Sequence, residues 1–329
     1  MRNILVAGGA GYIGSHIVKD LCGQNYHVIV YDNLSEGHRE AVTSLQGKGC
    51  DFFHGDLNDS SALDNVFEKN KIDAVMHFAA YAYVGESVAN PEKYYKNNVA
   101  ASINLFSSML KYNVKNIIFS SSCTTYGIPQ YTPIDEDHPQ NPISPYGASK
   151  LMVERIISDY HNAYGLQYMI LRYFNAAGAH PDGSIGESHK TETHLIPLVL
   201  KTLTGEKESI AVFGTDYDTP DGTCVRDYIH VCDLAAAHRI SLEALFSGKE
   251  SRCINLGNGV GFSVKEIISV CEEVTGMKVP VKTAERRPGD PPLLTASSNY
   301  KKYLPDFIPR YDIRDIIKTA WEWEKNKKF

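Results

Sequence analysis

The sequence contains no CxxC pair, no long apolar run and no excess of basic residues. Its seven cysteines, at positions 22, 50, 123, 224, 232, 253 and 271, form an odd set without the spacing of a disulfide framework or a zinc site. No stretch approaches the ~20 consecutive apolar residues of a membrane span, and a formal net charge of −6 gives no basic footprint for nucleic acid. We therefore expect reduced thiols, and we expect no metal, no nucleic-acid partner and no membrane insertion.

The sequence also lacks a secretion signal, an internal repeat and a low-complexity tract. Its first residues, MRNILVAGGAGYIG, contain no basic region followed by an apolar core and a small-residue cleavage site. With 43% apolar and 22% charged residues, the composition is ordinary for a water-soluble protein. We expect a cytoplasmic protein, and its 329 residues suit one large and one small domain.

Apolar, β-branched runs alternate with helical stretches along the first half of the chain. The runs are NILVAG, HVIVYD, DFFHGD, AVMHFA, NIIFSS and YMILRYF. This alternation predicts an α/β fold with a doubly wound parallel sheet, the Rossmann arrangement, in residues 1–175. The Gly- and Pro-rich AAGAHPDGSIG then ends the alternation. We expect a smaller mixed α/β substrate domain over 176–329, with about 226–249 rejoining the first domain because its helical period is strong.

Three glycines predict a dinucleotide site. Gly8, Gly11 and Gly14 follow the first strand and open a helix, where backbone can approach a pyrophosphate, although glycines also make ordinary strand-to-helix turns. Asp32 ends the second strand about 20 residues later, where a carboxylate binds a ribose hydroxyl and repels the extra phosphate of NADP. The pattern therefore favours NAD. Asp56, after the third strand, fits an adenine contact and a helix cap equally well.

The stretch SPYGASKLMVE places Tyr146 four residues before Lys150, on one face of a predicted helix. Acting as a base near pH 7 requires the pKa of tyrosine to fall by about 3 units. A cation about 4 Å away, at an effective dielectric constant of about 20, supplies that shift, with help from a positive nicotinamide ring. The alternative is an ordinary pair of Lys150 with Glu154. Ser122 and Thr124 follow the fifth strand, at the sheet edge that binds ligands, and can relay a proton to Tyr146.

Eight motifs occur in a characteristic order over nearly the whole chain. They are GGAGYIGSH, DNL, HFAAYAYVGES, SSSCTTYG, SPYGASK, LRYFNAAGAHP, GTCVRDYIHV and RRPGD. Together they resemble the UDP-glucose 4-epimerases, which are extended short-chain dehydrogenase/reductases. The resemblance implies interconversion of UDP-galactose and UDP-glucose: Tyr146 takes the proton of the sugar 4-hydroxyl, hydride passes from C4 to tightly held NAD, and the 4-keto sugar turns over and takes the hydride back.

The resemblance also implies roles for individual residues. The catalytic set would be Tyr146, Lys150, Ser122 and Thr124. The cofactor set would be Gly8, Gly11, Tyr12, Ile13, Gly14, Asp32, Asn33, Asp56, Leu57, Phe78, Ala79, Tyr146, Lys150 and Tyr173. The substrate set would be Ser122, Tyr146, Asn175, His194, Leu195, Phe213, Arg226, Arg287, Asp290 and Leu294.

Three positions depart from the commonest pattern of the family. Ala82 stands where many such enzymes have a lysine that helps to hold the cofactor phosphates, so we expect looser NAD retention. His194 replaces a common asparagine, and AYAYVGES resembles UDP-arabinose 4-epimerases, which leaves a UDP-arabinose/UDP-xylose 4-epimerase as an alternative. Leu294 is smaller than the tyrosine that excludes N-acetylated sugars in some relatives, so we expect UDP-N-acetylglucosamine and UDP-N-acetylgalactosamine to be accepted as well.

Two further alternatives have weaker support from the sequence. A nucleotide-sugar 4,6-dehydratase needs a carboxylate after the strand-five threonine to drive elimination, and this chain has Thr124 followed by Thr125 there. A non-catalytic NAD sensor shares the fold, but such a protein can lack the tyrosine or the lysine, and both Tyr146 and Lys150 are present.

The resemblance finally implies a homodimer. Its interface would be a four-helix bundle built from helices at about 91–112 and 146–164. Their apolar side chains could equally pack on the sheet. Those side chains include Leu105, Met109, Leu151 and Ile157.

Overall fold

A computed structural model describes residues 1–287, 289–297 and 299–329. The chain forms two compact units. The first unit comprises Met1–Gly127, Gln140–Arg172 and Ala235–Ile254. The second unit comprises Ile128–Pro139, Tyr173–Leu234 and Asn255–Phe329.

The first unit contains a seven-stranded sheet with strand order β10-β6-β5-β4-β1-β2-β3. The pairs β1–β2, β1–β4, β2–β3 and β4–β5 are all parallel. The prediction of a doubly wound parallel sheet is therefore confirmed. The strands are β1 (Arg2–Ala7), β2 (Tyr26–Asp32), β3 (Cys50–His54), β4 (Ala74–His77), β5 (Asn116–Ser122), β6 (Gln167–Tyr173) and β10 (Arg252–Leu256).

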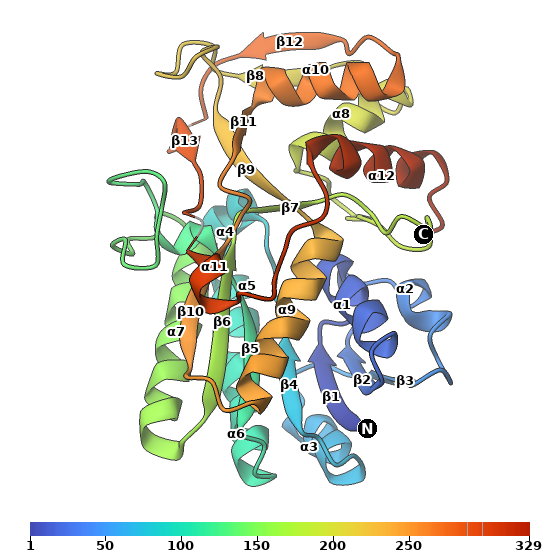
Figure 1. Ribbon diagram of the computed structural model, residues 1–329, viewed down its shortest axis with the longest axis vertical. Helices are drawn as coiled ribbons and strands as arrows, with labels where there is room; N and C mark the ends of the chain where they lie inside the picture. Colours follow the sequence, from blue (N-terminus) through green and yellow to red (C-terminus); the bar gives the residue numbers. More distant parts are fainter. Residues whose placement is uncertain (288, 298) are drawn as a thin grey trace. The chain divides into compact units, whose positions relative to one another are not determined.

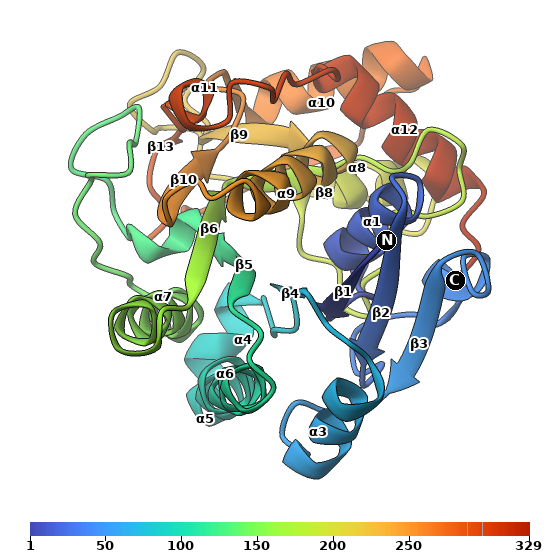
Figure 2. The same ribbon diagram turned by 60° about the horizontal axis from the view of Figure 1, so that its bottom comes forward.

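Helices cover both faces of this sheet. Figure 2 shows α3, α6 and α7 on one face, and α1 and α9 on the other. The helices and helical turns of this part of the chain are α1 (Tyr12–Cys22), α2 (Glu40–Thr43), α3 (Ser60–Lys69), α4 (Val84–Ala89), α5 (Pro91–Tyr94), the π-helix η1 (Tyr95–Ala100), α6 (Ala101–Lys111), the 3-10 helix η2 (Cys123–Thr125), α7 (Pro145–Tyr164) and α9 (Val231–Phe246).

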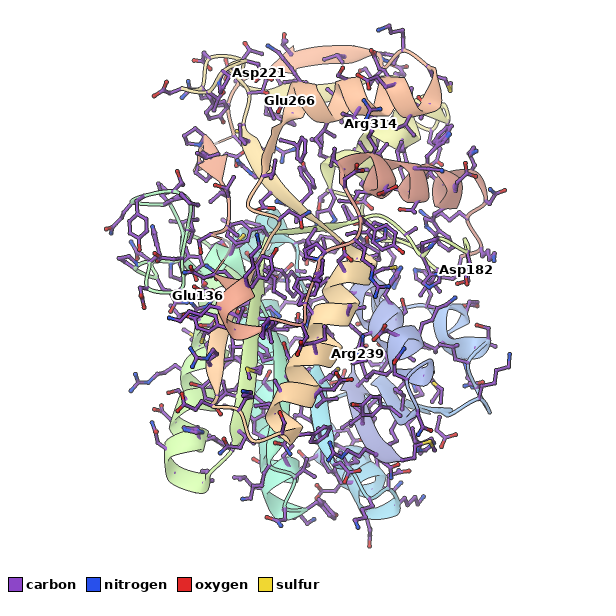
Figure 3. The ribbon with its side chains drawn as sticks, in the orientation of Figure 1. Glu136, Asp182, Asp221, Arg239, Glu266 and Arg314 are labelled. Carbon is purple, nitrogen blue, oxygen red and sulfur yellow. The ribbon has the colours of Figure 1, made fainter. Side chains whose placement is uncertain are left out.

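The core of the first unit explains this layering, because the sheet is apolar on both sides. Leu5 and Ile117 of the sheet pack against Leu105 and Met109 of α6 and Ile157 of α7, and all five side chains are fully buried. On the opposite face, Arg239 of α9 (labelled in Figure 3) donates from Nε to Asp20 of α1 at 2.8 Å. Three apolar side chains of α6 and α7 thus serve the sheet.

The order of the strands creates a switch point between β1 and β4. After β3 at one edge, the chain crosses to the other side of β1, and Ala7 then lies in register with His77. Ligands of open α/β sheets bind outside the carboxyl ends of the strands at such a point. Gly8 follows one of these strands, and Phe78 follows the other.

The second unit combines a small mixed sheet with three packed helices, as Figure 1 shows for α8, α10 and α12. β9 pairs with β7, β11 and β13, and β8 pairs with β12. Buried apolar side chains from the three helices form one core, for example Leu200, Ile267 and Ile316. The elements are β7 (Asn175–Ala177), α8 (Leu195–Leu203), β8 (Ile210–Phe213), β9 (Val225–His230), β11 (Gly261–Ser263), α10 (Val264–Thr275), β12 (Val281–Ala284), β13 (Leu293–Leu294), α11 (Tyr300–Tyr303) and α12 (Ile313–Lys325).

Local sequence signals fix the ends of two of these helices. At α10, the Ser263 side chain accepts from the backbone N–H of Glu266 at 3.0 Å, and the Glu266 side chain accepts from that of Ser263 at 2.7 Å. Such a capping box satisfies two N–H groups that the helix leaves unpaired. Asp312 and Asp315 form the same arrangement at α12. Glu266 is labelled in Figure 3.

The compact units differ from the sequence-based domain ranges in three places. Residues 128–139 and 173–175 belong to the second unit, and the returning segment is Ala235–Ile254 instead of about 226–249. The reason is that β9, at the start of the expected segment, satisfies its backbone groups by pairing with β7, β11 and β13. Only the later part of α9 then belongs to the first unit.

α7 spans 20 residues and is the longest helix of the described chain. It carries charged side chains such as Lys150 and Glu154 in its middle. Among the described residues, no helix has both the length and the apolar character needed to cross a bilayer.

Candidate active site

The glycine turn between β1 and α1 brings backbone segments unusually close together. A Cβ on Gly8 would lie 2.4 Å from the backbone nitrogen of Ala79, and φ at Gly8 is +81°. A Cβ on Gly14 would lie 2.1 Å from the Gly8 carbonyl oxygen, and Gly11 caps α1 without any side-chain hydrogen bond. Only glycine fits at Gly8 and Gly14, and the first N–H groups of α1 are left for an anion. Tyr12 and Ile13 open the helix and are half-buried.

Asp32 lies beside this turn at the end of β2. Its carboxylate accepts from the backbone N–H of Ala10 at 2.9 Å and from that of Leu34 at 2.8 Å. It is 8% exposed, and burial raises its pKa although the two N–H groups work against that. The side chain is therefore held rigidly at the edge of the glycine turn.

The structure excludes one of the two roles, helix cap or adenine contact, that the sequence left open for Asp56. The residue that caps α3 is Asp59, whose side chain accepts from Ala62 N–H at 3.0 Å. Asp56 instead accepts from the Asn33 side-chain amide at 2.7 Å and from Asn58 N–H at 2.8 Å. The helix-cap interpretation of Asp56 is therefore wrong, while the adenine contact stays a prediction.

Other predicted cofactor residues border the same strand ends. Phe78 and Ala79 both donate their N–H groups to the carbonyl of Ala7, at 2.8 and 3.0 Å. Leu57 is buried, and its carbonyl accepts from the Asn104 amide at 3.0 Å. Ala82 is exposed, in the stretch between β4 and α4.

Tyr146 and Lys150 lie in the first two turns of α7. Ser144 caps this helix, because its hydroxyl accepts from Gly147 N–H at 3.2 Å, and Pro145 occupies the first position. The Lys150 ammonium donates to the Ser120 carbonyl at 2.8 Å and lies 5.9 Å from the centre of the Tyr146 ring. The predicted pairing on one helix face is therefore present.

Three hydroxyls meet at the carboxyl end of β5. The Ser122 side chain lies close enough to the Tyr146 hydroxyl to lower the pKa of that phenol. The Thr124 hydroxyl donates to Ser122 Oγ at 3.0 Å. A Cβ on Gly147 would lie 2.5 Å from the Thr124 carbonyl oxygen, so this glycine lets α7 approach the turn closely enough for the contact. Ser122 therefore interacts with both Thr124 and Tyr146.

The pKa values of the pair differ from the sequence-based expectation. Burial raises the pKa of Tyr146 to about 12, although the interaction with Ser122 works against that. Burial lowers the pKa of Lys150 to about 7, while the charge of Glu154 raises it. Desolvation by burial outweighs charge at both groups. Lys150 alone therefore does not bring Tyr146 into the neutral range.

Glu154 pairs with Arg172 and not with Lys150. Arg172 Nε donates to one oxygen of the Glu154 carboxylate at 2.9 Å, and Nη2 donates to the other at 2.6 Å. Both side chains are 5% exposed. The ordinary Lys150–Glu154 pair considered as an alternative is therefore not what the structure contains.

Five predicted substrate residues come together in the second unit. Arg226 on β9 forms an ion pair with Asp290 through Nη2 and lies in register with Leu294 of β13. The Arg287 guanidinium lies 4.0 Å above the centre of the Phe213 ring. Asp290 N–H donates to the Arg287 carbonyl at 3.3 Å, which joins the two pairs. This group, which we call the arginine patch, presents two guanidinium groups and an aromatic face.

The remaining predicted substrate residues lie in the same unit. Asn175 on β7 is in register with Tyr228 of β9, and its amide donates to the Asp227 carbonyl at 2.8 Å. His194 and Leu195 form the start of α8. Tyr173, a predicted cofactor residue, ends β6.

Sequence reasoning missed several residues that position this site. Asn98 is 3% exposed in the π-helix η1, where its side chain accepts from Tyr81 N–H at 2.9 Å and donates to Ser149 Oγ at 3.1 Å. Single π-helical turns often occur at functional sites. The residues YKNNVA show no periodicity from which the π-helix could have been predicted. The Ser120 carbonyl that accepts from Lys150 is a backbone group, so no residue type in the sequence indicates it. His77, a strand residue without a predicted role, is packed, with Nε2 2.7 Å from Ser102 Oγ.

Comparisons with known proteins agree with this geometry. A model described as the NAD dependent epimerase/dehydratase family matches residues 4–257. The chain is 50% identical over 323 residues to the UDP-glucose 4-epimerase of Halalkalibacterium halodurans, covering 98% of this chain and 95% of that protein. The crystal structure of UDP-glucose 4-epimerase from Brucella ovis in complex with NAD is similar with a TM-score of 0.94 and 49% identity over 98% of both chains. The UDP-Glc/GlcNAc 4-epimerase from Campylobacter jejuni has a TM-score of 0.88 and 42% identity, covering 99% of this chain and 100% of that one. The chain therefore belongs to the NAD dependent epimerase/dehydratase family.

Proposed function

We propose that the chain interconverts UDP-glucose and UDP-galactose by moving a hydride and a proton at C4 of the sugar. The observation that carries the proposal is the grouping of the Thr124, Ser122 and Tyr146 hydroxyls beside the buried Lys150. The same unit holds the glycine turn, so a base and a dinucleotide site occur together. The relatives named above carry this activity in their names.

The first unit fits NAD. Gly8, Gly11 and Gly14 leave room for a pyrophosphate at the start of α1, where a Cβ on Gly8 or Gly14 would collide with backbone atoms. Asp32 would bind the adenosine ribose, with Asn33 and Asp56 beside it. When bound, NAD supplies a hydride acceptor and donor and a positively charged ring.

Tyr146 would take and return the proton of the sugar 4-hydroxyl. Ser122 and Thr124 can hold that hydroxyl and pass its proton along their hydrogen bonds. Burial keeps the phenol of Tyr146 protonated at neutral pH in the structure described, because its pKa is raised to about 12. Its work as a base therefore requires positive charge beyond that of Lys150.

The arginine patch would bind the UDP part of the substrate. Guanidinium groups pair bidentately with phosphate oxygens, which suits Arg226 and Arg287. The Phe213 ring can flank the uracil base, and Asp290 can accept a ribose hydroxyl once Arg226 turns to the phosphates. Asn175, His194, Leu195 and Leu294 belong to the same proposed site.

Replacing Tyr146 with Phe tests the assigned base. We expect turnover to fall by about 10²–10⁴-fold, because proton transfer is lost, while bound NAD stays. The matched control is Tyr164→Phe, the same change at the exposed end of α7, which should leave turnover unchanged. NAD released by heat is quantified alongside epimerisation of UDP-galactose. Wild-type turnover in Tyr146→Phe would rule out this base.

The comparisons favour this function over the alternatives raised by the sequence. The relatives are named UDP-glucose 4-epimerases, and neither a pentose-specific epimerase, a 4,6-dehydratase nor a sensor has comparable support. The turn after β5 also offers hydroxyls from Ser122 and Thr124 at the place where elimination needs a carboxylate.

We also propose that N-acetylated UDP-sugars are substrates. Leu294 is opposite Arg226 on β13, and a leucine there leaves more space than a tyrosine. A 42% identical relative is named for both UDP-Glc and GlcNAc. Assays on UDP-galactose and UDP-N-acetylgalactosamine should both give the 4-epimer, and Leu294→Tyr should remove only the second activity. Activity on the non-acetylated pair alone in the wild type contradicts this proposal.

A homodimer and a cytoplasmic location are part of the proposal. Ile103 on α6 and Met152 on α7 remain 39% and 45% exposed, on the helices expected at the interface. All seven cysteines are free thiols, which suits a reducing compartment.

A further inference from the structure

Four potential metal ligands lie together in the loop before α8. Glu187, His189, Glu192 and His194 each offer one ligand atom, and these atoms all lie within 4.8 Å of one another. His189 Nδ1 is 3.1 Å from Glu187 Oε1 and 3.5 Å from Glu192 Oε2. His194 Nδ1 is 3.5 Å from Glu192 Oε1 and is hydrogen-bonded to Glu187 Oε1. All four come from one segment of the second unit.

Three of these separations match a tetrahedral coordination shell. Zn²⁺ binds imidazole nitrogen and carboxylate oxygen at about 2.0–2.2 Å, so neighbouring ligand atoms are about 3.3–3.6 Å apart. The distances of 3.1 and 3.5 Å are close to that spacing, whereas the hydrogen-bonded His194 and Glu187 atoms have to move apart to admit the ion. Metal binding would release the protons of the two imidazoles, and the two neutral imidazoles and two carboxylates would then carry a charge of −2, which balances one divalent cation.

The surroundings hold the ligands in place. The side chains of Glu187 and Glu192 are 6% and 4% exposed, whereas that of His194 is 51% exposed and gives solvent access. Glu192 Oε1 accepts from the N–H groups of Thr193 and His194, both at 2.8 Å. Trp323 of α12 donates to the Glu187 carbonyl at 2.9 Å. Outer contacts of this kind orient metal ligands and are part of a built site.

We propose that Glu187, His189, Glu192 and His194 bind one divalent transition-metal ion, with Zn²⁺ the best match. Imidazole and carboxylate donors suit Zn²⁺. Four protein ligands leave no open coordination position, so the site is structural and not catalytic. The ion closes the loop that leads into α8 and fixes the backbone of His194 and Leu195. The site itself does not depend on the proposed function.

The cysteines lack the spacing of a zinc site, which is why we expected no metal, but histidine and glutamate can supply ligands in their place. The pattern E-x-H-x-x-E-x-H from Glu187 to His194 is the signal that could have found the site. Its four donors become a cluster only because the loop folds back on itself before α8.

Metal binding to the full-length protein tests the proposal. The protein is dialysed against a chelator, and Co²⁺ is added because its visible absorption distinguishes tetrahedral from octahedral ligation. We expect one tetrahedral Co²⁺ per chain, displaced by one equivalent of Zn²⁺. Zn²⁺ at a hundred times its dissociation constant should raise the thermal midpoint by about 4 °C. Unchanged spectra and an unchanged thermal midpoint would show that the four side chains only pair with one another and bind no metal. That result would overturn the proposal.

Two variants and a control locate the metal. Loss of a residue that only supports a metal ligand typically weakens metal affinity by about 10- to 100-fold. His189→Ala and Glu192→Gln remove proposed ligands, so each should weaken Co²⁺ and Zn²⁺ binding by more than that. Circular dichroism checks that both remain folded, and Glu192→Gln keeps the size of the side chain. His180→Ala is the control, because His180 Nδ1 pairs with Asp182 at 2.7 Å elsewhere in the same unit (Asp182 is labelled in Figure 3). Equal loss in the control, or full binding in both variants, would refute the assigned ligands.

Discussion

Breaking the buried ion pair of Glu154 and Arg172 from one side should destabilise the fold strongly, because it leaves one charge buried where β6 meets the helix that carries Tyr146 and Lys150. Both oxygens of the Glu154 carboxylate are engaged by the Arg172 guanidinium, at 2.9 and 2.6 Å. The carboxylate also accepts from Ser121 at 2.5 Å. Since both charged side chains are 5% exposed, neither can recover water when its partner is removed.

The size of the effect follows from what each variant leaves buried. Arg172→Leu leaves a carboxylate without its cation, and Glu154→Leu leaves a guanidinium without its anion, so each should cost about 3–5 kcal/mol. The double variant buries no charge. It loses three other hydrogen bonds, those of Ser121 and Gln140 with the carboxylate and of Tyr126 with the guanidinium, at about 1 kcal/mol each. We therefore expect a loss of about 3 kcal/mol for the double variant, well below the sum of the singles.

Urea unfolding of the four proteins, followed by circular dichroism, measures this double-mutant cycle. The reasoning predicts a coupling energy of at least about 3 kcal/mol. Single variants that lose less than about 1 kcal/mol, or a double variant whose loss equals the sum, would refute it. NAD content measured on the same samples shows whether loosening α7 also disturbs the cofactor site.

Two further predictions concern the proposed binding sites. Gly14→Ala should abolish NAD retention, because the new Cβ would lie 2.1 Å from a backbone oxygen of the glycine turn. The control is Gly85→Ala in α4, whose Cβ would meet nothing within 4 Å and which should retain NAD in the same assay. Retention of NAD by both variants would argue against the turn as the pyrophosphate site. Arg287→Ala should raise KM for UDP-galactose by about 10-fold or more with little change in kcat, as expected for loss of one charge-assisted phosphate contact. Arg286→Ala removes the same charge from a side chain already bonded to Asp216 and should leave KM near the wild-type value, so equal effects of the two would contradict the assignment.

The sheet was predictable because its strands are short apolar runs that are buried on both faces. Ile4 and Leu5 point to opposite faces of β1, and both are fully buried, so the sequence shows continuous apolar residues there. The resemblance to UDP-glucose 4-epimerases and the choice of NAD are confirmed by the family and its relatives. These features depend on local sequence, which is why they could be found without a structure.

Contacts between distant segments could not be predicted in the same way. The pairing of Glu154 with Arg172 displaced the local alternative with Lys150, since residues 18 positions apart meet only after β6 packs beside α7. The partners of β9 depend on three strands from separate parts of the chain. The pKa of Tyr146 rose because burial outweighed charge, and spacing along a helix carries no information on burial.

Epimerisation without added cofactor tests the central claim most directly. The purified protein is incubated with UDP-galactose in buffer free of NAD, and the nucleotide sugars are separated and quantified. We predict that UDP-glucose forms until the two sugars reach equilibrium, while the NAD content per chain stays constant. A protein that contains NAD but forms no UDP-glucose would contradict the account.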